Sequence, residues 1–183
     1  MIKFEKVKRF QNDDSFNLPV RKTAGSAGYD FEVAEDIVIP PYRACTEKLK
    51  EFQHKLPSQP GLKDIARWTS STARPTLVPT GVKCYMDPGY YLEITLRSST
   101  PLKYWLICAN SEGIIDADYY SNPDNDGEIF FQVINLSPSK IYLKKGDIIG
   151  QGIIKKYVTV DDDEATAERT GGFGSTTIEG ENK

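Results

Sequence analysis

The sequence predicts an all-β fold, and three features of the chain indicate this class. Apolar residues alternate with charged ones over residues 2–8, and further short apolar stretches recur along the chain. Turn-forming residues such as those at 40–41 and 87–89 separate these stretches. Helical spacing of apolar residues is confined to one segment, 46–68. Many short strands punctuated in this way are typical of a β-barrel or double-sheet architecture.

We expect a strand in each of the following ranges: 2–8, 36–39, 76–85, 90–96, 104–108, 128–135, 141–143 and 148–157. Together they predict one β domain over residues 1–158, of the kind that closes as a jelly-roll-like barrel. A length of 183 residues suits one domain with a real core.

An inserted segment at about 43–75 interrupts the strand pattern. Leu49, Phe52 and Leu56 lie at helical spacing, and Pro57 ends the run. The segment is too short for a core of its own, so we interpret it as a short helical insertion that packs on the barrel. A docking surface is the alternative interpretation.

The C-terminal segment 159–183 differs from the rest of the chain. An acidic run at 161–164 is followed by small residues and by the glycine-rich stretch 171–174. This composition is unsuited to a core element and predicts a flexible arm.

Composition excludes several functional classes. The hydrophobic fraction of 39% and charged fraction of 27% are ordinary for a soluble globular protein. The net charge is -3 without a block of Lys or Arg, which argues against a nucleic-acid polymer as partner. The first residues are charged and alternating, so we expect no signal peptide, no membrane span and a cytoplasmic location.

Histidine and cysteine usage argues against several kinds of site. His54 is the only histidine, which disfavours a His-rich metal site and a Ser-His-Asp triad. Cys45, Cys84 and Cys108 show no CxxC spacing, so neither zinc nor a disulfide framework is indicated.

Two polar stretches lie beside expected strands. Ala27-Gly28-Tyr29-Asp30 precedes a strand and alone indicates only a turn. Arg97-Ser98-Ser99-Thr100 ends the strand 90–96, where an arginine fork and serine hydroxyls suit phosphate oxygens. An N-capping serine that starts a short helical turn is the alternative interpretation of the second stretch.

The stretch 110–119, NSEGIIDADY, carries two carboxylates. Ile114 and Ile115 predict a buried strand with Asp116 at its tip, and Asp118 would share a face with Asp116 in an extended chain. A carboxylate held rigidly there can accept a proton from an attacking water. The alternative is an Asp-rich turn in which Tyr119 serves packing.

Two further stretches carry isolated polar residues near the C-terminus. Gln151 is the long polar side chain in the apolar run 148–154, so it needs a hydrogen-bonding partner or a ligand. Arg169 and Phe173 flank the glycines of the arm, where the arginine could meet phosphate and the phenylalanine could stack on a base. A disordered tail is the alternative.

Taken together, the five stretches resemble the five motifs of the trimeric dUTP pyrophosphatase (dUTPase) family, in family order from Ala27 to Thr176. The third is the most specific, because its Asn, Gly, Asp and Tyr recur every three residues. The segment 78–82 also resembles the family's lead-in strand.

This resemblance implies a fold and an activity. It implies a jelly-roll-like β-barrel, a homotrimer with sites shared among its chains, and hydrolysis of dUTP to dUMP and pyrophosphate with Mg²⁺. The reaction would keep uracil out of DNA and supply dUMP for thymidylate synthesis. Phage members and some bacterial members of the family also carry unusual loops, so the resemblance suggests a phage-type protein. The expected location is the cytoplasm of a bacterium or of a phage-infected host.

The resemblance also implies a role for each matched residue. Asp116 would activate water for attack on the α-phosphorus, and Tyr119 would pack under the deoxyribose and exclude a 2′-hydroxyl. Asp30 would hold Mg²⁺ through its waters. Uracil and phosphate contacts would come from Asn110, Gly113, Ile114, Ile115, Arg97, Ser98, Ser99, Gln151, Arg169, Phe173 and Gly174.

The chain departs from the family pattern at several places. Leu96 and Ile148 stand where the family commonly has Pro and Arg, and the arm motif is one residue short. Residues 121–126 lengthen the third motif's hairpin, and the insertion at 43–75 is unusual. Two alternatives therefore stay open: a dCTP deaminase of the same fold, or a dUTPase that also binds a regulatory protein through its insertion.

Overall fold

The computed structural model describes residues 1–42, 58–59, 61, 74–167, 169 and 171–172. Its strands are β1 (Ile2–Lys6), β2 (Tyr29–Glu32), β3 (Ile37–Ile39), β4 (Thr76–Pro79), β5 (Val82–Met86), β6 (Tyr90–Leu96), β7 (Leu106–Cys108), β8 (Gly113–Asp116), β9 (Phe130–Asn135), β10 (Ile141–Leu143) and β11 (Ile148–Lys156). Short helical segments are η1 (Lys8–Phe10), α3 (Ser99–Tyr104) and η2 (Ala117–Tyr119). The prediction of an all-β fold is confirmed.

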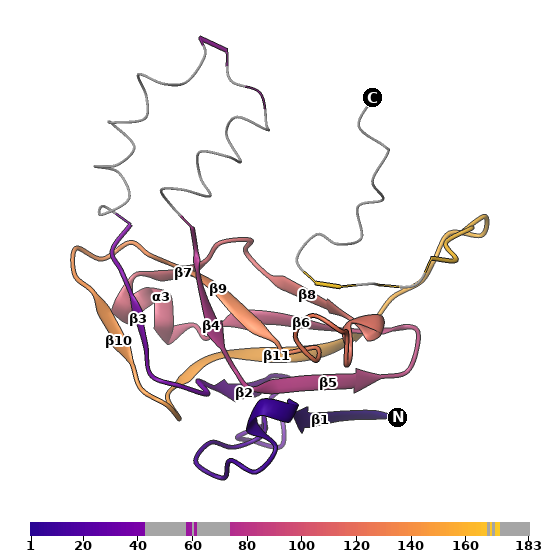
Figure 1. The fold of residues 1–183 in the computed structure, drawn as a ribbon, viewed down its shortest axis with the longest axis horizontal. Coiled ribbons are helices and arrows are strands. Elements are labelled where there is room, and N and C mark those ends of the chain that lie inside the picture. The colour runs from indigo at the N-terminus through magenta and orange to yellow at the C-terminus, as the bar shows by residue number, and fades with distance from the viewer. Residues whose placement is uncertain (43–57, 60, 62–73, 168, 170, 173–183) are drawn as a thin grey trace.

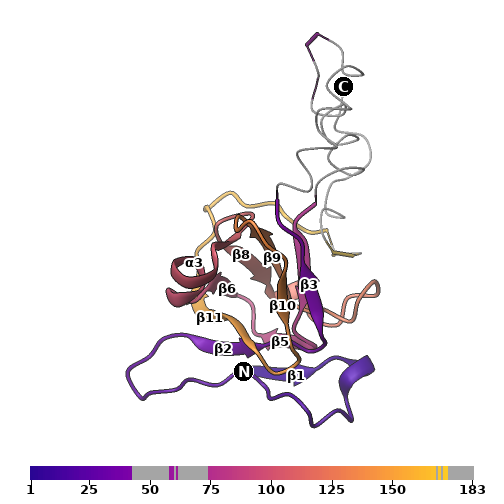
Figure 2. The same cartoon turned by 90° about the vertical axis from the view of Figure 1, so that its left-hand side faces the viewer.

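The strands form small antiparallel sheets that surround one interior (Figure 1). The largest sheet has the order β2-β11-β6-β8, and β4-β9-β7 forms a second. The pairs β1-β5 and β10-β3 complete the wall, and Figure 2 shows β2 and β1 along one side with α3 beside β6 and β11. Because β6 and β11 pair over seven positions, they form the longest ladder beneath the site described below.

The core lies between these sheets and is apolar and aromatic. Phe31 on β2 and Phe131 on β9 are fully buried and meet edge to face at 5.9 Å. Leu92 on β6 and Ile149 on β11 pack in the same cluster. The alternating burial along β6 and β9 follows the period-2 pattern that the sequence predicted.

Among the expected strands, 90–96 and 141–143 have the expected limits, whereas the other ranges differ from the structure at one or both ends. The range 76–85 divides into β4 and β5, because Gly81 adopts φ +65° and interrupts the extended chain. The range 104–108 shrinks to β7, because α3 runs to Tyr104 and Trp105 ends that helix in a left-handed conformation. The range 128–135 begins two residues later, at Phe130.

Strands β2 and β8 lie where the motifs placed a strand, but they differ from the expectation in limits or burial. Asp30 lies within β2, not in a turn before a strand. The strand expected at Ile114-Ile115, with Asp116 at its tip, is present as β8, but the expectation that it is buried is wrong, because Ile114 is 54% exposed on this edge strand. The expectation of a shared strand face for Asp116 and Asp118 is also wrong, because Asp118 belongs to η2.

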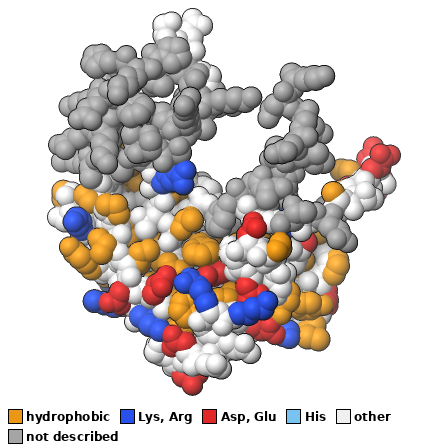
Figure 3. Space-filling view, viewed as in Figure 1, with side chains coloured by type: hydrophobic (Ala, Val, Ile, Leu, Met, Phe, Trp, Pro, Cys, Tyr) orange, Lys and Arg blue, Asp and Glu red, His pale blue; other side chains and the backbone are white. Residues whose placement is uncertain are grey.

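Several expectations fall outside the described residues or are only partly covered. The helical insertion with Leu49, Phe52 and Leu56 lies outside them, and so does the arm from Phe173 onward. The segment from 159 to 167 is described as exposed. Within the described part, no helix is long and apolar enough to cross a membrane. Acidic and basic side chains intermingle on the face in Figure 3, in keeping with the absence of a basic block in the sequence.

Candidate functional site

Asp116 is the last residue of β8, an edge strand of the largest sheet. Its backbone pairs with Tyr91 on β6, so the ladder fixes the position of the carboxylate. The 3-10 turn η2 follows at once and leads the chain away, which leaves the Asp116 side chain 52% exposed. A carboxylate on a rigid strand end with access to solvent can act on an attacking water.

Arg169 binds both carboxylates of this segment. Its Nη2 donates to Asp116 Oδ2 at 2.6 Å, and its Nε donates to Asp118 Oδ1 at 2.8 Å. The guanidinium carbon also lies 5.8 Å from the centre of the Tyr119 ring. Arg169, the arginine of the C-terminal arm, therefore contacts Asp116, the expected general base, within the same chain.

Tyr119 is the buried residue of this group, with 7% of its surface exposed. Its hydroxyl donates to the Glu128 carbonyl oxygen at 3.0 Å and accepts from Asn125 Nδ2 at 2.7 Å. Burial raises the pKa of the phenol, and the Asn125 hydrogen bond opposes that rise. The Tyr119 phenol is therefore neutral at physiological pH, and its ring is held in one position at the side of the site.

A pocket opens between the 110–119 hairpin and β9. Its lining includes the apolar residues Ile115 and Phe130 and the polar residues Asn110 and Gln132. Asp116, Gly113, Tyr119 and Arg169 also line it. A small pocket that combines apolar side chains with polar groups able to form hydrogen bonds suits a flat heteroaromatic ring. Ile114 also lines it, while its side chain remains largely exposed.

A second group gathers across β2, β11 and β6. Gln151 on β11 lies opposite Asp30 on one side and Thr95 on the other. A Cβ atom added at Gly28 would lie 2.3 Å from Gln151 Oε1, so the glutamine side chain rests directly on the Gly28 backbone. Glycine is needed at that position because any side chain would displace Gln151.

Arg97 adds a positive charge to this second group. Its Nη1 lies 3.5 Å from Asp30 Oδ2, and it follows β6 directly. Ser98 and Ser99 begin α3, with Ser98 as N-cap but without a side-chain capping bond. The alternative interpretation of a short helical turn is therefore confirmed, with Ser98 at the N-cap position but with its side chain not used for capping.

Asp30 is the candidate residue for a metal. It is 8% exposed, and its Oδ2 is the one buried side-chain oxygen or nitrogen in the described part that has no hydrogen-bond partner. A buried carboxylate oxygen with spare acceptor capacity suits a water of a hydrated Mg²⁺ ion. The described residues contain no group of three or more His, Cys, Asp or Glu arranged to hold a metal directly.

The two groups lie toward opposite ends of β6. Asp116 is opposite Tyr91, whereas Gln151 is opposite Thr95. Four residues along a strand span roughly 13 Å. One chain thus brings together Asn110, Asp116, Tyr119 and Arg169, and separately Asp30, Arg97 and Gln151, but it does not join the two groups. Phe173 and Gly174 lie outside the described residues.

Sequence reasoning missed the residues that support Tyr119. Asn122 and Asn125 lie in the loop 121–126, and buried Glu128 accepts from Arg9 Nε at 2.9 Å and Nη2 at 2.7 Å. The two asparagines directly after the third motif were the available signal, because Asn folds short loops through side-chain hydrogen bonds. The link to Arg9 spans 119 residues and left no local signal.

Comparisons with known proteins point to one family. A family profile described as dUTPase matches residues 64–177. The deoxyuridine 5′-triphosphate nucleotidohydrolase of Lactococcus lactis subsp. lactis (strain IL1403) is 37% identical over 94% of this chain and 95% of that protein. The crystal structure of a dUTPase from Streptococcus mutans superposes with a TM-score of 0.66 at 34% identity, covering 86% of this chain and 98% of the other.

A phage protein shares the fold at lower identity. The dUTPase from phage phi11 of S. aureus superposes with a TM-score of 0.60 at 16% identity, covering 94% of this chain and 99% of that chain. At this identity the likeness concerns the fold alone.

Proposed function

The chain belongs to the dUTPase family and is a dUTP nucleotidohydrolase, and we propose that Asp116 activates the water that attacks the α-phosphorus of dUTP. The products are dUMP and pyrophosphate, so the reaction would keep uracil out of DNA and supply dUMP for thymidylate synthesis. The position of Asp116 carries the proposal. It is a half-exposed carboxylate at the end of a paired strand, and it lines a pocket that suits a pyrimidine.

The pocket around Asn110 supplies selectivity for the base. We propose that Asn110 and the backbone of Gly113 to Ile115 read the uracil edge. Close walls would leave no room for the methyl group of thymine. Tyr119, buried and hydrogen bonded at its hydroxyl, would pack under the deoxyribose.

The group around Gln151 supplies contacts to the phosphate chain. Arg97, Ser98, Ser99 and Gln151 would bind phosphate oxygens, and Asp30 would hold Mg²⁺ through its waters. Bound Mg²⁺ would neutralise the triphosphate charge and orient it for in-line displacement. Asp30 suits this role because its buried oxygen has spare acceptor capacity.

A homotrimer would unite the two groups. Their separation by four residues along β6 means that one chain holds the proposed base and the proposed phosphate ligands apart. A partner chain that presents its Gln151 group to this chain's Asp116 group would complete each site. Arg169, Phe173 and Gly174 of an arm would then close over the γ-phosphate and the uracil.

The base assignment is tested by Asp116→Asn, with Asp118→Asn as the matched control. Both variants lose one carboxylate that binds Arg169, but only the first loses the proposed base. We expect Asp116→Asn to retain binding of a non-hydrolysable dUTP analogue and to lose about 10²–10⁴-fold in kcat. Asp118→Asn should lose far less. Parent-like turnover by Asp116→Asn would overturn the assignment.

A substrate panel separates this activity from deamination. Pyrophosphate and ammonia release would be measured for dUTP, dTTP, dCTP and UTP, with and without Mg²⁺. We expect pyrophosphate from dUTP alone and dependence on Mg²⁺. Ammonia release from dCTP would favour the deaminase alternative, which the family comparisons do not support.

A regulatory partner is a separate hypothesis. It rests on the insertion at 43–75, which lies largely outside the described residues. Deletion of residues 46–68, followed by activity and pull-down measurements, tests it. Retained activity with loss of a captured protein would support a second role, and capture unchanged by the deletion would argue against the insertion.

A further inference from the structure

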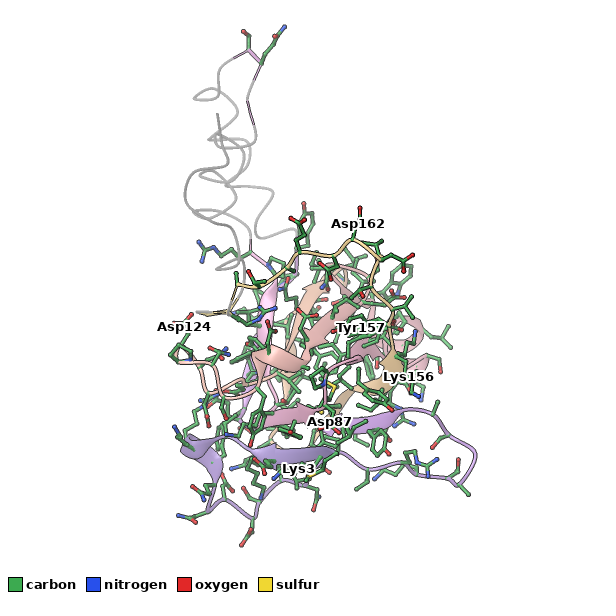
Figure 4. All side chains as sticks on the ribbon, turned by 90° about the vertical axis from the view of Figure 1, so that its right-hand side faces the viewer. Lys3, Asp87, Asp124, Lys156, Tyr157 and Asp162 are labelled. Atoms are coloured by element: carbon green, nitrogen blue, oxygen red, sulfur yellow. The ribbon has the colours of Figure 1, made fainter. Side chains whose placement is uncertain are left out.

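The loop 121–126 has an internal hydrogen-bond framework centred on Asn122. Asn122 Oδ1 accepts from the backbone amides of Asp124 at 3.0 Å and Asn125 at 3.3 Å. Its Nδ2 donates to the Tyr119 carbonyl at 3.1 Å and to Asn125 Oδ1 at 2.8 Å. Asn122 is 5% exposed although the loop stands away from the body, with Asp124 at its outer end (Figure 4). The framework defines the conformation of the loop.

The base of this loop is tied to the barrel by charge. Lys83 Nζ on β5 contacts Asp126 Oδ1 at 3.0 Å and Ser121 Oγ at 2.9 Å. The Lys8 amide donates to Asp126 Oδ2 at 2.8 Å. Since Lys83 is only 7% exposed, these contacts are partly shielded from water and hold both ends of the loop in place.

The fixed loop aims Asn125 at Tyr119. Asn125 Nδ2 donates to the Tyr119 hydroxyl at 2.7 Å, while the hydroxyl proton is used by the Glu128 carbonyl at 3.0 Å. Asn125 Oδ1 is occupied within the loop by Asn122 Nδ2 and the Gly127 amide. The tyrosine ring is therefore restrained at its hydroxyl end from two directions.

We propose that Asn125 is a positioning residue that helps the site to discriminate deoxyribose from ribose. It does so by holding the Tyr119 ring against the place where C2′ of the substrate would lie. This inference rests on the proposed function, in which Tyr119 packs under the deoxyribose. A pocket rejects a single added hydroxyl only weakly if its wall can retreat. A wall locked by neighbouring hydrogen bonds retains the close fit that excludes the ribose form.

Asn125→Asp is the main test, because it is nearly isosteric and keeps the Oδ1 acceptor inside the loop. It replaces the donor to Tyr119 by a second acceptor. The single hydroxyl proton of Tyr119 cannot serve both a carboxylate and the Glu128 carbonyl, so one restraint is lost. We expect the ratio of kcat/KM for dUTP to that for UTP to fall roughly 3- to 10-fold, as for loss of one ordinary hydrogen bond.

Two comparisons separate positioning from general stability. Pro123→Ala, an exposed change in the same loop, should leave the dUTP to UTP ratio unchanged. Tyr119→Phe should lower the ratio, and adding Asn125→Asp to it should lower the ratio little further, because both changes remove the same contact. Melting temperatures of all variants would be recorded alongside.

The contact can also be observed without any substrate. In nucleotide-free protein labelled with ¹³C-tyrosine, Asn125→Asp should shift the Tyr119 Cζ resonance, and Pro123→Ala should not. A shift with an unchanged dUTP to UTP ratio would overturn the proposal, as would equal losses for both nucleotides that follow the melting temperature. Failure of the parent protein to hydrolyse dUTP would instead overturn the proposed function, whether or not the Tyr119 Cζ resonance shifts in Asn125→Asp.

Discussion

Arg169 Nη2 lies 2.6 Å from Asp116 Oδ2, so the arginine of the C-terminal arm is paired with the proposed general base of the same chain. Asp118 accepts a second bond from that guanidinium at 2.8 Å, and Arg169 is only 13% exposed. The Gly172 amide, three residues on, donates to Asp124 Oδ2 at 3.2 Å. Arg169 and Gly172 thus contact the site that the arm is proposed to close.

Arg169→Gln tests whether this arginine exchanges carboxylates for phosphate. The charge-assisted bonds of a guanidinium are the strong class of protein hydrogen bond. We expect kcat/KM for dUTP to fall about 10- to 100-fold, as for loss of one such bond. Steady-state kinetics would be compared with Lys156→Gln, which removes one positive charge at the exposed end of β11. An equal loss in both variants would mean that Arg169 contributes only charge.

Gly28→Ala tests the place of Gln151 in the site. The added methyl would lie 2.3 Å from Gln151 Oε1 and 3.2 Å from its Cβ, so the side chain must turn away. We expect kcat/KM for dUTP to fall about 10- to 100-fold, as for one lost bond to a charged group. Gly25→Ala is the matched control, because nothing lies within 4 Å of its added methyl. Similar kinetics for the two variants would remove Gln151 from the phosphate contacts.

Asp30→Asn tests the route by which magnesium binds. Because the described residues offer no cluster of three ligands, we expect Mg²⁺ alone to change the melting temperature little. Mg²⁺ added with a non-hydrolysable dUTP analogue should raise it further than the analogue alone, and Asp30→Asn should reduce that increment. A large rise with Mg²⁺ alone in the parent protein would contradict this expectation.

The strands were predictable where burial follows a simple period. The ranges 90–96 and 141–143 match β6 and β10, because their limits are set by local turns. β8 was misjudged because its two isoleucines suggest burial, whereas an edge strand leaves Ile114 exposed. The start of the strand expected at 104–108 depended on Trp105, whose left-handed conformation has no simple sequence signature.

The site was predictable as a set of motifs but not as a geometry. Register in the sheet places Gln151 beside Asp30, a relationship across 121 positions that no local pattern encodes. The same limit hid the support that Asn125 gives to Tyr119. The roles of these residues stay predictions.

Asp126→Asn tests how the loop 121–126 is held, through the pH dependence of stability. Burial opposes ionisation of Asp126, but the bonds from the Lys8 amide and Lys83 prevail and lower its pKa. A lowered folded-state pKa contributes stability that is present above the ordinary value of ~3.9 and is lost as the pH falls through the folded-state value. The parent protein should therefore melt above Asp126→Asn at about pH 6–7, with a difference that shrinks below about pH 4. Asp162→Asn, in the exposed segment labelled in Figure 4, controls for the loss of one negative charge. A difference that stays constant down to about pH 3 would show that the ion pair with Lys83 does not anchor the loop.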